Sequence, residues 1–173
     1  MRTIRLLFHT RPWLALLAAA VLAGCSTDSS QPTPVSAPPP TRVLLRVETL
    51  PDINPDQSGR PSPVLLRIYQ LRATAAFEGA DFFALFQNDR GVLAADLLHK
   101  DEFILRPGDK RELRFEAQPD TQVIAAYAAF RQLDTAQWRV VAPVTRHGLN
   151  TITLRLSGDR MLLSPSSPPP RTR

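Results

Sequence analysis

Side chains that could bind a cation are regularly spaced in residues 50–63, LPDINPDQSGRPSP. Three of them match the first, third and fifth ligand positions of a calcium-binding loop: Asp52, Asn54 and Asp56. The rest of the pattern fails, because Gln57 stands where such a loop needs glycine and Pro63 where it needs a bidentate glutamate. Arg60 would add a positive charge beside the cation. The spacing therefore does not predict a metal site.

Side chains suited to acid–base or nucleophilic catalysis are sparse. After the N-terminal segment there are two histidines, His99 and His147, far apart in sequence and each in a turn-like setting. Asp101 and Glu102 are adjacent, so on a strand they would point to opposite faces. The motifs of hydrolases, zinc proteases and phosphate-binding loops do not occur. We therefore predict no enzymatic activity and no bound cofactor, unless the fold brings the two histidines together.

The N-terminal residues predict a lipoprotein signal peptide. Arg2, Arg5 and Arg11 precede an apolar run, PWLALLAAAVL, which is too short to span a bilayer, and LAGC follows it. Cys25, the only cysteine of the chain, stands directly after the expected cleavage site, where its thiolate would take up a diacylglyceryl group. We expect Cys25 to carry a covalent lipid with two or three acyl chains, such as palmitate, which together give a lasting anchor. Ser26, in place of an aspartate, favours sorting to the outer membrane.

Charge gives no indication of nucleic-acid binding. The chain has 21 Lys and Arg against 16 Asp and Glu, a formal net charge of +5. Removal of the signal peptide takes three arginines and no acid, which leaves +2. No run of Lys and Arg is longer than two residues, and aromatic residues do not alternate with basic ones as a stacking surface would require.

The composition divides the chain into four parts. They are a signal peptide (residues 1–24), a lipidated cysteine with a proline-rich linker (25–41), a folded domain (42–163) and a disordered proline-rich tail (164–173). About sixteen linker residues at roughly 3.1 Å each could hold the domain up to about 50 Å from the membrane. Some 120 residues suffice for one domain with its own core.

The domain is predicted to be mostly strands. Alternation marks residues 43–49, 64–71 and 151–156, and the inward positions are Val43, Leu45, Val47, Val64, Leu66, Ile68, Ile152, Leu154 and Leu156. The turn RPGD predicts a hairpin between EFIL and KRELRFEA, with Leu113 and Phe115 on the core face. Residues 138–144 form a further strand, which Pro143 confines to a sheet edge. Short strands separated by turns favour a β-sandwich.

Two segments depart from this pattern. Residues 121–133 have the alanine content of a helix but are apolar on both faces, as a central strand would be, and periodicity does not decide between the two. In residues 76–89, Asp81 is a plausible N-cap for a short helix that carries Phe82, Phe83 and Phe86. A helix that covers the sheet is favoured over an exposed binding patch, since clustered aromatic residues usually belong to a core.

The connection over residues 50–62 is long for an antiparallel sandwich, where two to five residues are usual. Its prolines, with Gly59, limit the number of conformations, so less entropy is lost when a partner binds. We predict that it is a docking loop, although a plain connecting loop is an alternative. The residues predicted to contact a partner are Asn54, Pro55, Asp56, Gln57, Ser58, Gly59, Arg60 and Pro61.

Several blocks of the sequence, in order and spacing, resemble one family. They are the lipobox, LPDINPDQSGRPSPVLLRIYQLR, FEGADFFALF, EFILRPG and VIAAYAAFRQLDTAQWRV. This arrangement, from residue 25 to about residue 156, resembles the outer-membrane lipoprotein of type VI secretion systems, the TssJ (VasD/SciN) family. The proline-rich linker and tail are not part of the resemblance.

The resemblance implies a transthyretin-like two-sheet β-sandwich with a short helical insertion and no enzymatic activity. It implies a strand over residues 122–131. It also implies a structural role at the periplasmic face of the outer membrane, where the loop over residues 51–63 would bind the periplasmic C-terminal domain of TssM, itself joined to TssL. On this loop Asn54, Asp56 and Arg60 are the polar candidates. The alternative function is a periplasmic transthyretin-like carrier of a small apolar ligand, which would need a cavity.

Overall fold

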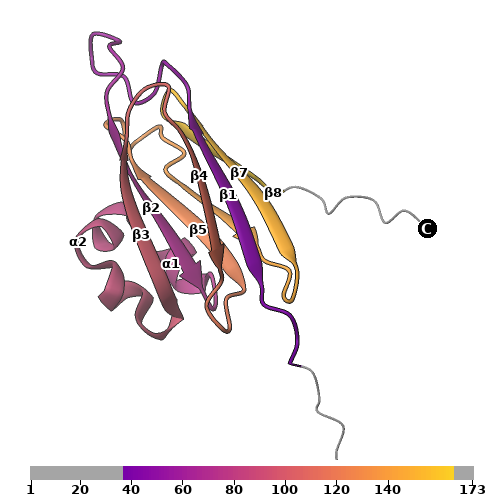
Figure 1. Cartoon of the computed structure of the whole chain (residues 1–173). Helices are drawn as coiled ribbons and strands as arrows, with labels where there is room; N and C mark the ends of the chain where they lie inside the picture. The colour runs from indigo at the N-terminus through magenta and orange to yellow at the C-terminus, as the bar shows by residue number, and fades with distance from the viewer. Residues whose placement is uncertain (1–36, 166–173) are drawn as a thin grey trace, which may run out of the picture. The chain divides into compact units, whose positions relative to one another are not determined.

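The computed structural model describes residues 37–165, which form two four-stranded sheets packed face to face, with helices on one side (Figure 1). The strands are β1 (Arg42–Thr49), β2 (Val64–Leu71), β3 (Leu97–Leu105), β4 (Lys110–Glu116), β5 (Val123–Ala129), β6 (Arg139–Pro143), β7 (Leu149–Ser157) and β8 (Arg160–Pro165). Between β2 and β3 lie α1 (Ala75–Gly79), α2 (Phe82–Leu93) and the 3-10 turn η1 (Ala94–Asp96). The predicted β-sandwich with a short helical insertion is confirmed.

The strand order corrects one predicted hairpin. One sheet has the order β4-β1-β7-β8 and the other β3-β2-β5-β6, and every neighbouring pair is antiparallel except β1 and β7, which run parallel. The RPGD turn forms, with a φ of 81° at Gly108, but it carries the chain from β3 in one sheet to β4 in the other. A turn sequence fixes only the local reversal of the chain. Pairing depends on which face each strand buries. β3 pairs with β2, and β4 pairs with β1.

The main core lies between the two sheets. The nine inward positions predicted for residues 43–49, 64–71 and 151–156 are all at most 2% exposed. Leu113 and Phe115 pack against them as predicted. β5 is buried on both faces, because Ile124 faces this core while Tyr127 faces the helices. This position explains the apolar sequence VIAAYAA, and the strand expected over residues 122–131 is confirmed as Val123–Ala129. β6 is an edge strand, also as predicted.

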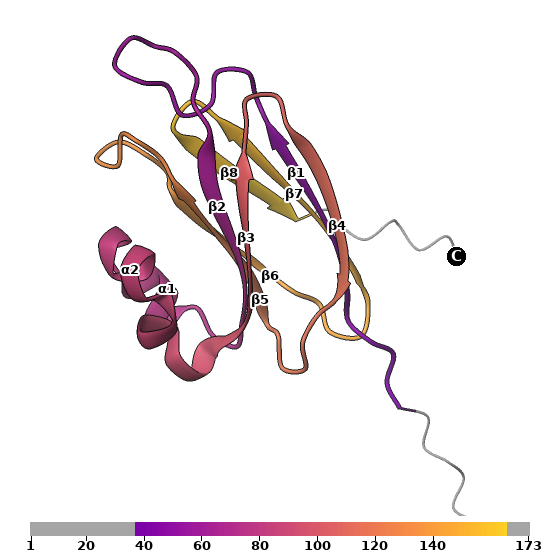
Figure 2. The ribbon, with the colours of Figure 1, turned by 60° about the vertical axis from the view of Figure 1, so that its left-hand side comes forward.

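A second, smaller core lies between α1, α2 and the outer face of the sheet that contains β2 and β5 (Figure 2). The Asp81 side chain accepts a hydrogen bond from the Ala84 amide at 2.9 Å, so the predicted N-cap is confirmed. Leu85 is fully buried, whereas Phe83 is 59% exposed and Phe86 43% exposed. The helix covers the sheet as predicted, but two of its phenylalanines face outwards.

The sequence analysis did not predict β8. This strand includes residues 164–165, which were assigned to the disordered tail. The Gly158–Asp159 turn joins β7 to β8, with Gly158 at a φ of 55°, and Ser157 pairs with Arg160 across it. Met161 is fully buried. Gly-Asp between two alternating runs is typical of a two-residue hairpin, and this signal would have predicted the strand.

The predicted signal peptide over residues 1–24, Cys25, the linker up to residue 36 and the tail from residue 166 lie outside the described residues. Within residues 37–165, no helix has the length and apolar character needed to cross a membrane.

Candidate partner-binding loop

The β1–β2 connection, residues 50–63, projects from one end of the sandwich (Figures 1 and 2). The chain enters β1 at the other end, where residues 37–41 lead into Arg42. Eight residues of β1 separate the two ends, which corresponds to about 26 Å of extended chain. The connection therefore faces away from the point where the predicted linker joins the domain.

The base of the loop is fixed by Asn54, which is only 4% exposed. Its side-chain Nδ2 donates to the Pro63 carbonyl at 2.7 Å, and its Oδ1 accepts from the Arg131 amide at 2.8 Å. Its own amide donates to the Gly158 carbonyl at 2.7 Å. Its φ of 50° lies in the left-handed region, which asparagine tolerates better than most residues. Asn54, predicted as a contact residue, thus holds the loop in shape from the inside.

The tip of the loop closes around Asp56. The Asp56 carboxylate accepts hydrogen bonds from the amides of Ser58 and Arg60 at 2.9 and 3.0 Å and from the Arg60 Nε at 3.2 Å. The bond from the Arg60 amide, with those from Ser58 and the Arg60 guanidinium, lowers the pKa of Asp56 below its ordinary value. Gly59 has a φ of 77°, which lets its amide donate back to the Asp56 carbonyl at 2.8 Å. The tip is therefore a small ring with its own bonds.

We expect Asp56→Ala to loosen this ring without unfolding the domain. The amides of Ser58 and Arg60 lose their acceptor, so their hydrogen exchange should become at least about tenfold faster at neutral pH. Because the pKa of Asp56 is lowered, the wild-type protection should persist down to about pH 4 and fade as the carboxyl protonates below that. Gln57→Ala, at an exposed tip position, is the matched control. Unchanged exchange in Asp56→Ala would show that the ring does not depend on the carboxylate.

The three residues with calcium-like spacing have different partners. Asp52 accepts from the Ser157 hydroxyl at 3.2 Å, Asn54 bonds to the base of the loop, and Asp56 bonds to its tip. Their side chains serve the hydrogen-bond framework of the loop and do not converge on one point.

The exposed part of the loop borders a groove of about 560 Å³. One wall comes from Pro55, Asp56, Gln57 and Ser58, and the other from Arg131 and Gln132 in the β5–β6 connection. Gln57, Ser58, Gly59, Arg60 and Pro61 are exposed, so the structure leaves them accessible as predicted contact residues. The sequence analysis missed Arg131 and Gln132, since only the fold brings residues 131–132 next to residues 55–58.

The two histidines have separate partners. His99 Nε2 lies 3.3 Å from Asp101 Oδ1 on β3. His147, with a φ of 59°, has its Nδ1 2.9 Å from the Pro39 carbonyl and donates its amide to the Thr41 hydroxyl at 2.9 Å. His147 therefore holds the end of the linker, and neither of these contacts joins the two histidines to each other.

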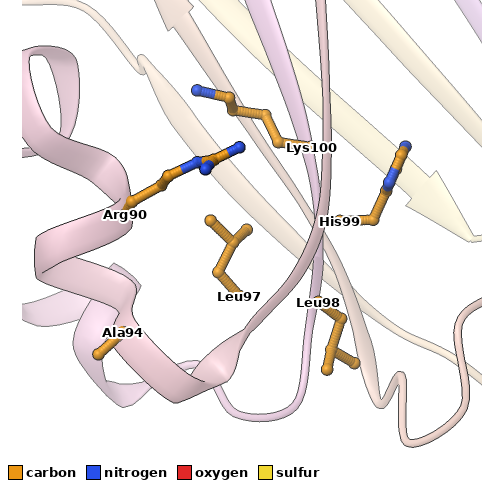
Figure 3. A pocket seen from close by; sticks show the side chains of 6 residues that line it. All are labelled: Arg90, Ala94, Leu97, Leu98, His99 and Lys100. Carbon is orange, nitrogen blue, oxygen red and sulfur yellow. The ribbon is translucent and has the colours of Figure 1, made fainter.

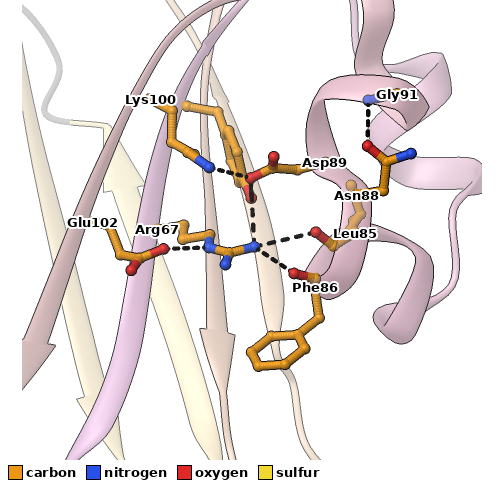
Figure 4. Close-up of polar contacts among 9 residues, drawn as sticks. Arg67, Leu85, Phe86, Asn88, Asp89, Gly91, Lys100 and Glu102 are labelled. Atoms are coloured by element: carbon orange, nitrogen blue, oxygen red, sulfur yellow. Dashed lines mark hydrogen bonds and ion pairs between the residues drawn. The ribbon is translucent and has the colours of Figure 1, made fainter.

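A buried polar network beneath α2 was also missed (Figure 4). Asp89 Oδ2 accepts from Lys100 Nζ at 2.8 Å, from the Tyr69 hydroxyl at 3.2 Å and from Arg67 Nη1 at 3.4 Å. Burial alone would raise the pKa of Asp89, but Lys100, Tyr69 and Arg67 outweigh it and hold that pKa below its ordinary value. Arg67 also donates to Glu102 and to the Leu85 and Phe86 carbonyls, so one side chain fastens the helix to the sheet.

Trp138 and Arg139, at the start of β6, fasten the other end of the insertion. Arg139 Nη1 donates to the carbonyls of Phe77 and Ala80, at 3.0 and 2.7 Å, where α1 ends. The Trp138 ring lies edge-on to Phe82 at 5.5 Å. Trp138 and Arg139 thus position the helices.

Comparison with known proteins places these features in one family. The family model described as type VI secretion lipoprotein, VasD, EvfM, TssJ, VC_A0113, matches residues 41–159. The chain belongs to the type VI secretion lipoprotein family. The matched region runs from the first residue before β1 to the β7–β8 turn, so it includes the candidate loop and the helical insertion. This family consists of structural lipoproteins and is not an enzyme family.

Solved structures agree with the TssJ assignment. The chain is 35% identical to the type VI secretion lipoprotein TssJ1 from Pseudomonas aeruginosa, with a TM-score of 0.73 over 76% of this chain and all of that one. It is 27% identical to Serratia marcescens Lip, a membrane-bound component of the type VI secretion system, with a TM-score of 0.63 over 75% of this chain and 99% of that one. A chain from a structure of a type VI membrane complex is 28% identical, with a TM-score of 0.63 over 72% of this chain and 98% of that one. No protein with a curated description matches.

Proposed function

We propose that this TssJ-family protein anchors a type VI membrane complex to the periplasmic face of the outer membrane by binding the periplasmic C-terminal domain of TssM through its β1–β2 loop. TssM is the partner that the family resemblance implies, and TssL would be held indirectly through it. The similarity to a chain of a type VI membrane complex supports assembly into such a complex.

The observation that carries the proposal is the position and rigidity of the loop. It lies at the end of the sandwich opposite the linker, and Asn54 and Asp56 fix its base and tip. A loop that is already ordered loses little conformational entropy when it binds. The exposed residues Gln57, Ser58 and Arg60 would make the contacts, and Arg131 would extend them across the groove.

The remaining parts of the chain would provide the attachment. Residues 1–24 would direct export, and acyl chains on Cys25 would insert into the outer membrane and anchor the protein there. The proline-rich linker would set the distance between the membrane and the domain. The loop would then face the periplasm with its partner. Side chains from both sheets fill the space where a small-ligand carrier would need its cavity, so the structural role is favoured over a carrier.

The test is calorimetric titration of the mature lipoprotein, in detergent, with the periplasmic C-terminal domain of the TssM encoded in the same genome. Replacing residues 55–61 with a Gly-Ser segment of equal length keeps Ile53, Asn54 and Ser62, which form the base. We expect this replacement to weaken binding at least about 100-fold, because it removes both the rigid tip and its contacts.

Arg60→Ala should give a smaller loss than the replacement. Arg114→Ala, at a similarly exposed arginine on β4, is the matched control and should leave the affinity unchanged. Binding should be the same with calcium or with a chelator. A replacement variant that is folded and binds with wild-type affinity would refute the loop assignment, and the absence of any binding by the wild type would refute TssM as the partner.

A further inference from the structure

The outer face of α2 carries an apolar surface that the proposed function does not use. Phe83 and Phe86 are 59% and 43% exposed and lie one helical turn apart. Two large aromatic side chains exposed side by side differ from the single apolar residues that normally occur on protein surfaces. This pair is therefore a candidate contact surface.

Both rings are held in place by their surroundings. Phe86 stacks on Phe82 at 5.9 Å, with 12° between the ring planes, and Phe83 lies edge-on to Phe82 at 5.2 Å. Phe82 in turn stacks on Tyr127 at 5.1 Å. The Arg67 guanidinium carbon lies 5.4 Å from the centre of the Phe86 ring, and Arg67 also binds the Phe86 carbonyl (Figure 4). A partner would meet preordered rings and lose little entropy in fixing them.

A groove of about 490 Å³ lies at the C-terminal end of α2, between that helix, η1 and the start of β3, beyond the kink of the helix at Asn88. It is lined by Arg90, Ala94, Leu97, Leu98, His99 and Lys100, with no acidic side chain among them. In Figure 3 the Arg90 and Lys100 side chains extend over Leu97 on the same side of β3. The groove thus places Leu97 and Leu98 beside two cations.

The charges near the groove leave Arg90 without a counterion. Lys100 pairs with Asp89 and His99 with Asp101, while Arg67 is balanced by Asp89 and Glu102. Arg90 is exposed and makes no ion pair within residues 37–165. Arg90 therefore has no direct ion-pair partner among these residues, and a carboxylate from a partner could supply one, since it matches a guanidinium with two parallel hydrogen bonds.

We propose that the outer face of α2 and the groove at its C-terminal end bind a short segment of a partner protein, with apolar side chains packed on Phe83 and Phe86 and a carboxylate on Arg90. At 59% and 43% exposure the two phenylalanines provide about 200 Å² of contact, which suits a short segment better than a whole protein face of about 800 Å². A single cation without an ion-pair partner favours one carboxylate over a lipid surface, which would call for several basic residues. This surface does not depend on the loop, so the inference is independent of the proposed function.

The test selects binders from a displayed library of random twelve-residue peptides against the mature chain purified from membranes. We expect enrichment of peptides that combine two apolar residues about one helical turn apart with Asp or Glu. For an enriched peptide, fluorescence anisotropy should show a loss of at least about tenfold in affinity for the double variant Phe83→Gln/Phe86→Gln. Ile104→Gln, at another exposed apolar position on β3, is the matched control and should bind as the wild type does.

A charge exchange tests the role of Arg90. Arg90→Glu should bind the acidic peptide about tenfold more weakly than the wild type does. It should bind the same peptide with its acid replaced by Lys more tightly than the wild type does. Four results would overturn the proposal: no enrichment, enriched peptides that bind the double variant equally well, a dimer in sedimentation velocity that the double variant abolishes, or protection of residues 82–93 from hydrogen exchange only in nanodiscs of anionic lipid. The third result would assign the surface to a second copy and the fourth to a membrane.

Discussion

Asp89→Asn is expected to lower the free energy of unfolding by about 3 kcal/mol at neutral pH, because it leaves two buried or half-buried cations without their shared anion. Asn keeps the shape and one acceptor oxygen, so the loss reports mainly on charge. Arg67 still has its ion pair with Glu102, and Lys100 is partly exposed to water. The expected loss is therefore at the low end of the range for a broken buried ion pair. For a domain of this size the melting temperature should fall by roughly 10 °C.

The pH dependence of the unfolding free energy tests the role of the Asp89 charge directly. The pKa of Asp89 is lowered in the folded protein, so its contribution is present above the ordinary carboxyl pKa of about 3.9 and is lost as the pH falls through the folded value. Urea unfolding at pH 7 and at pH 3 should therefore show a large gap between wild type and variant at pH 7 and a smaller gap at pH 3.

Glu102→Gln provides the control for the Asp89 experiment. Its side chain is about half exposed and binds Arg67 at 2.7 Å, so its removal should cost less than about 1 kcal/mol. A gap between wild type and Asp89→Asn that is the same at both pH values would mean that the carboxylate charge does not stabilise the insertion.

Asn54→Ala is the second substitution with a large expected effect, about 3 kcal/mol of unfolding free energy. It leaves the Pro63 carbonyl and the Arg131 amide without their side-chain partner, at roughly 1–3 kcal/mol for a buried unsatisfied group. It also places a residue that disfavours the left-handed region at a φ of 50°, which adds about 1 kcal/mol.

A comparison of three variants separates these contributions. Asn54→Gly removes the same side chain but accepts the positive φ, so it should be about 1 kcal/mol more stable than Asn54→Ala. Asn54→Asp keeps the acceptor for the Arg131 amide but loses the donor to Pro63. Chemical denaturation gives the stabilities, and hydrogen exchange at Arg131 shows whether the β5–β6 connection loosens with the loop. Equal stability of the Ala and Gly variants would exclude backbone strain at this position.

Strict alternation predicted the inward faces of β1, β2 and β7, because a strand buried on one face shows its period directly in residues such as Leu45 and Leu154. It did not decide the nature of β5, which is buried on both faces and has no period. The hairpin between β3 and β4 was predicted wrongly for a different reason. A turn motif reports on four residues, whereas sheet membership depends on surfaces that lie far apart in the chain.

The candidate site shows the same limit. The length and prolines of residues 50–63 are sufficient to predict a rigid loop. The burial of a polar side chain such as Asn54 cannot be predicted from a loop sequence, so the sequence does not separate it from the exposed candidate contact residues. Its partners Pro63, Arg131 and Gly158 meet only in the fold. Arg67, Tyr69, Asp89 and Lys100 likewise occur as scattered polar residues on three elements, and no local pattern predicts their network.

The place of β1 in its sheet has a mechanical consequence. β1 pairs along its length with β4 on one side and β7 on the other, and its two ends connect to the linker and to the β1–β2 loop. In the proposed assembly, a pull between membrane and partner would act along the axis of this strand. Such a load is shared by the hydrogen bonds on both sides at once, in shear, and does not open them one after another. The strand that joins anchor to loop would thus resist extension, and a proline-rich linker, which is already extended and semi-rigid, would pass the tension on to it.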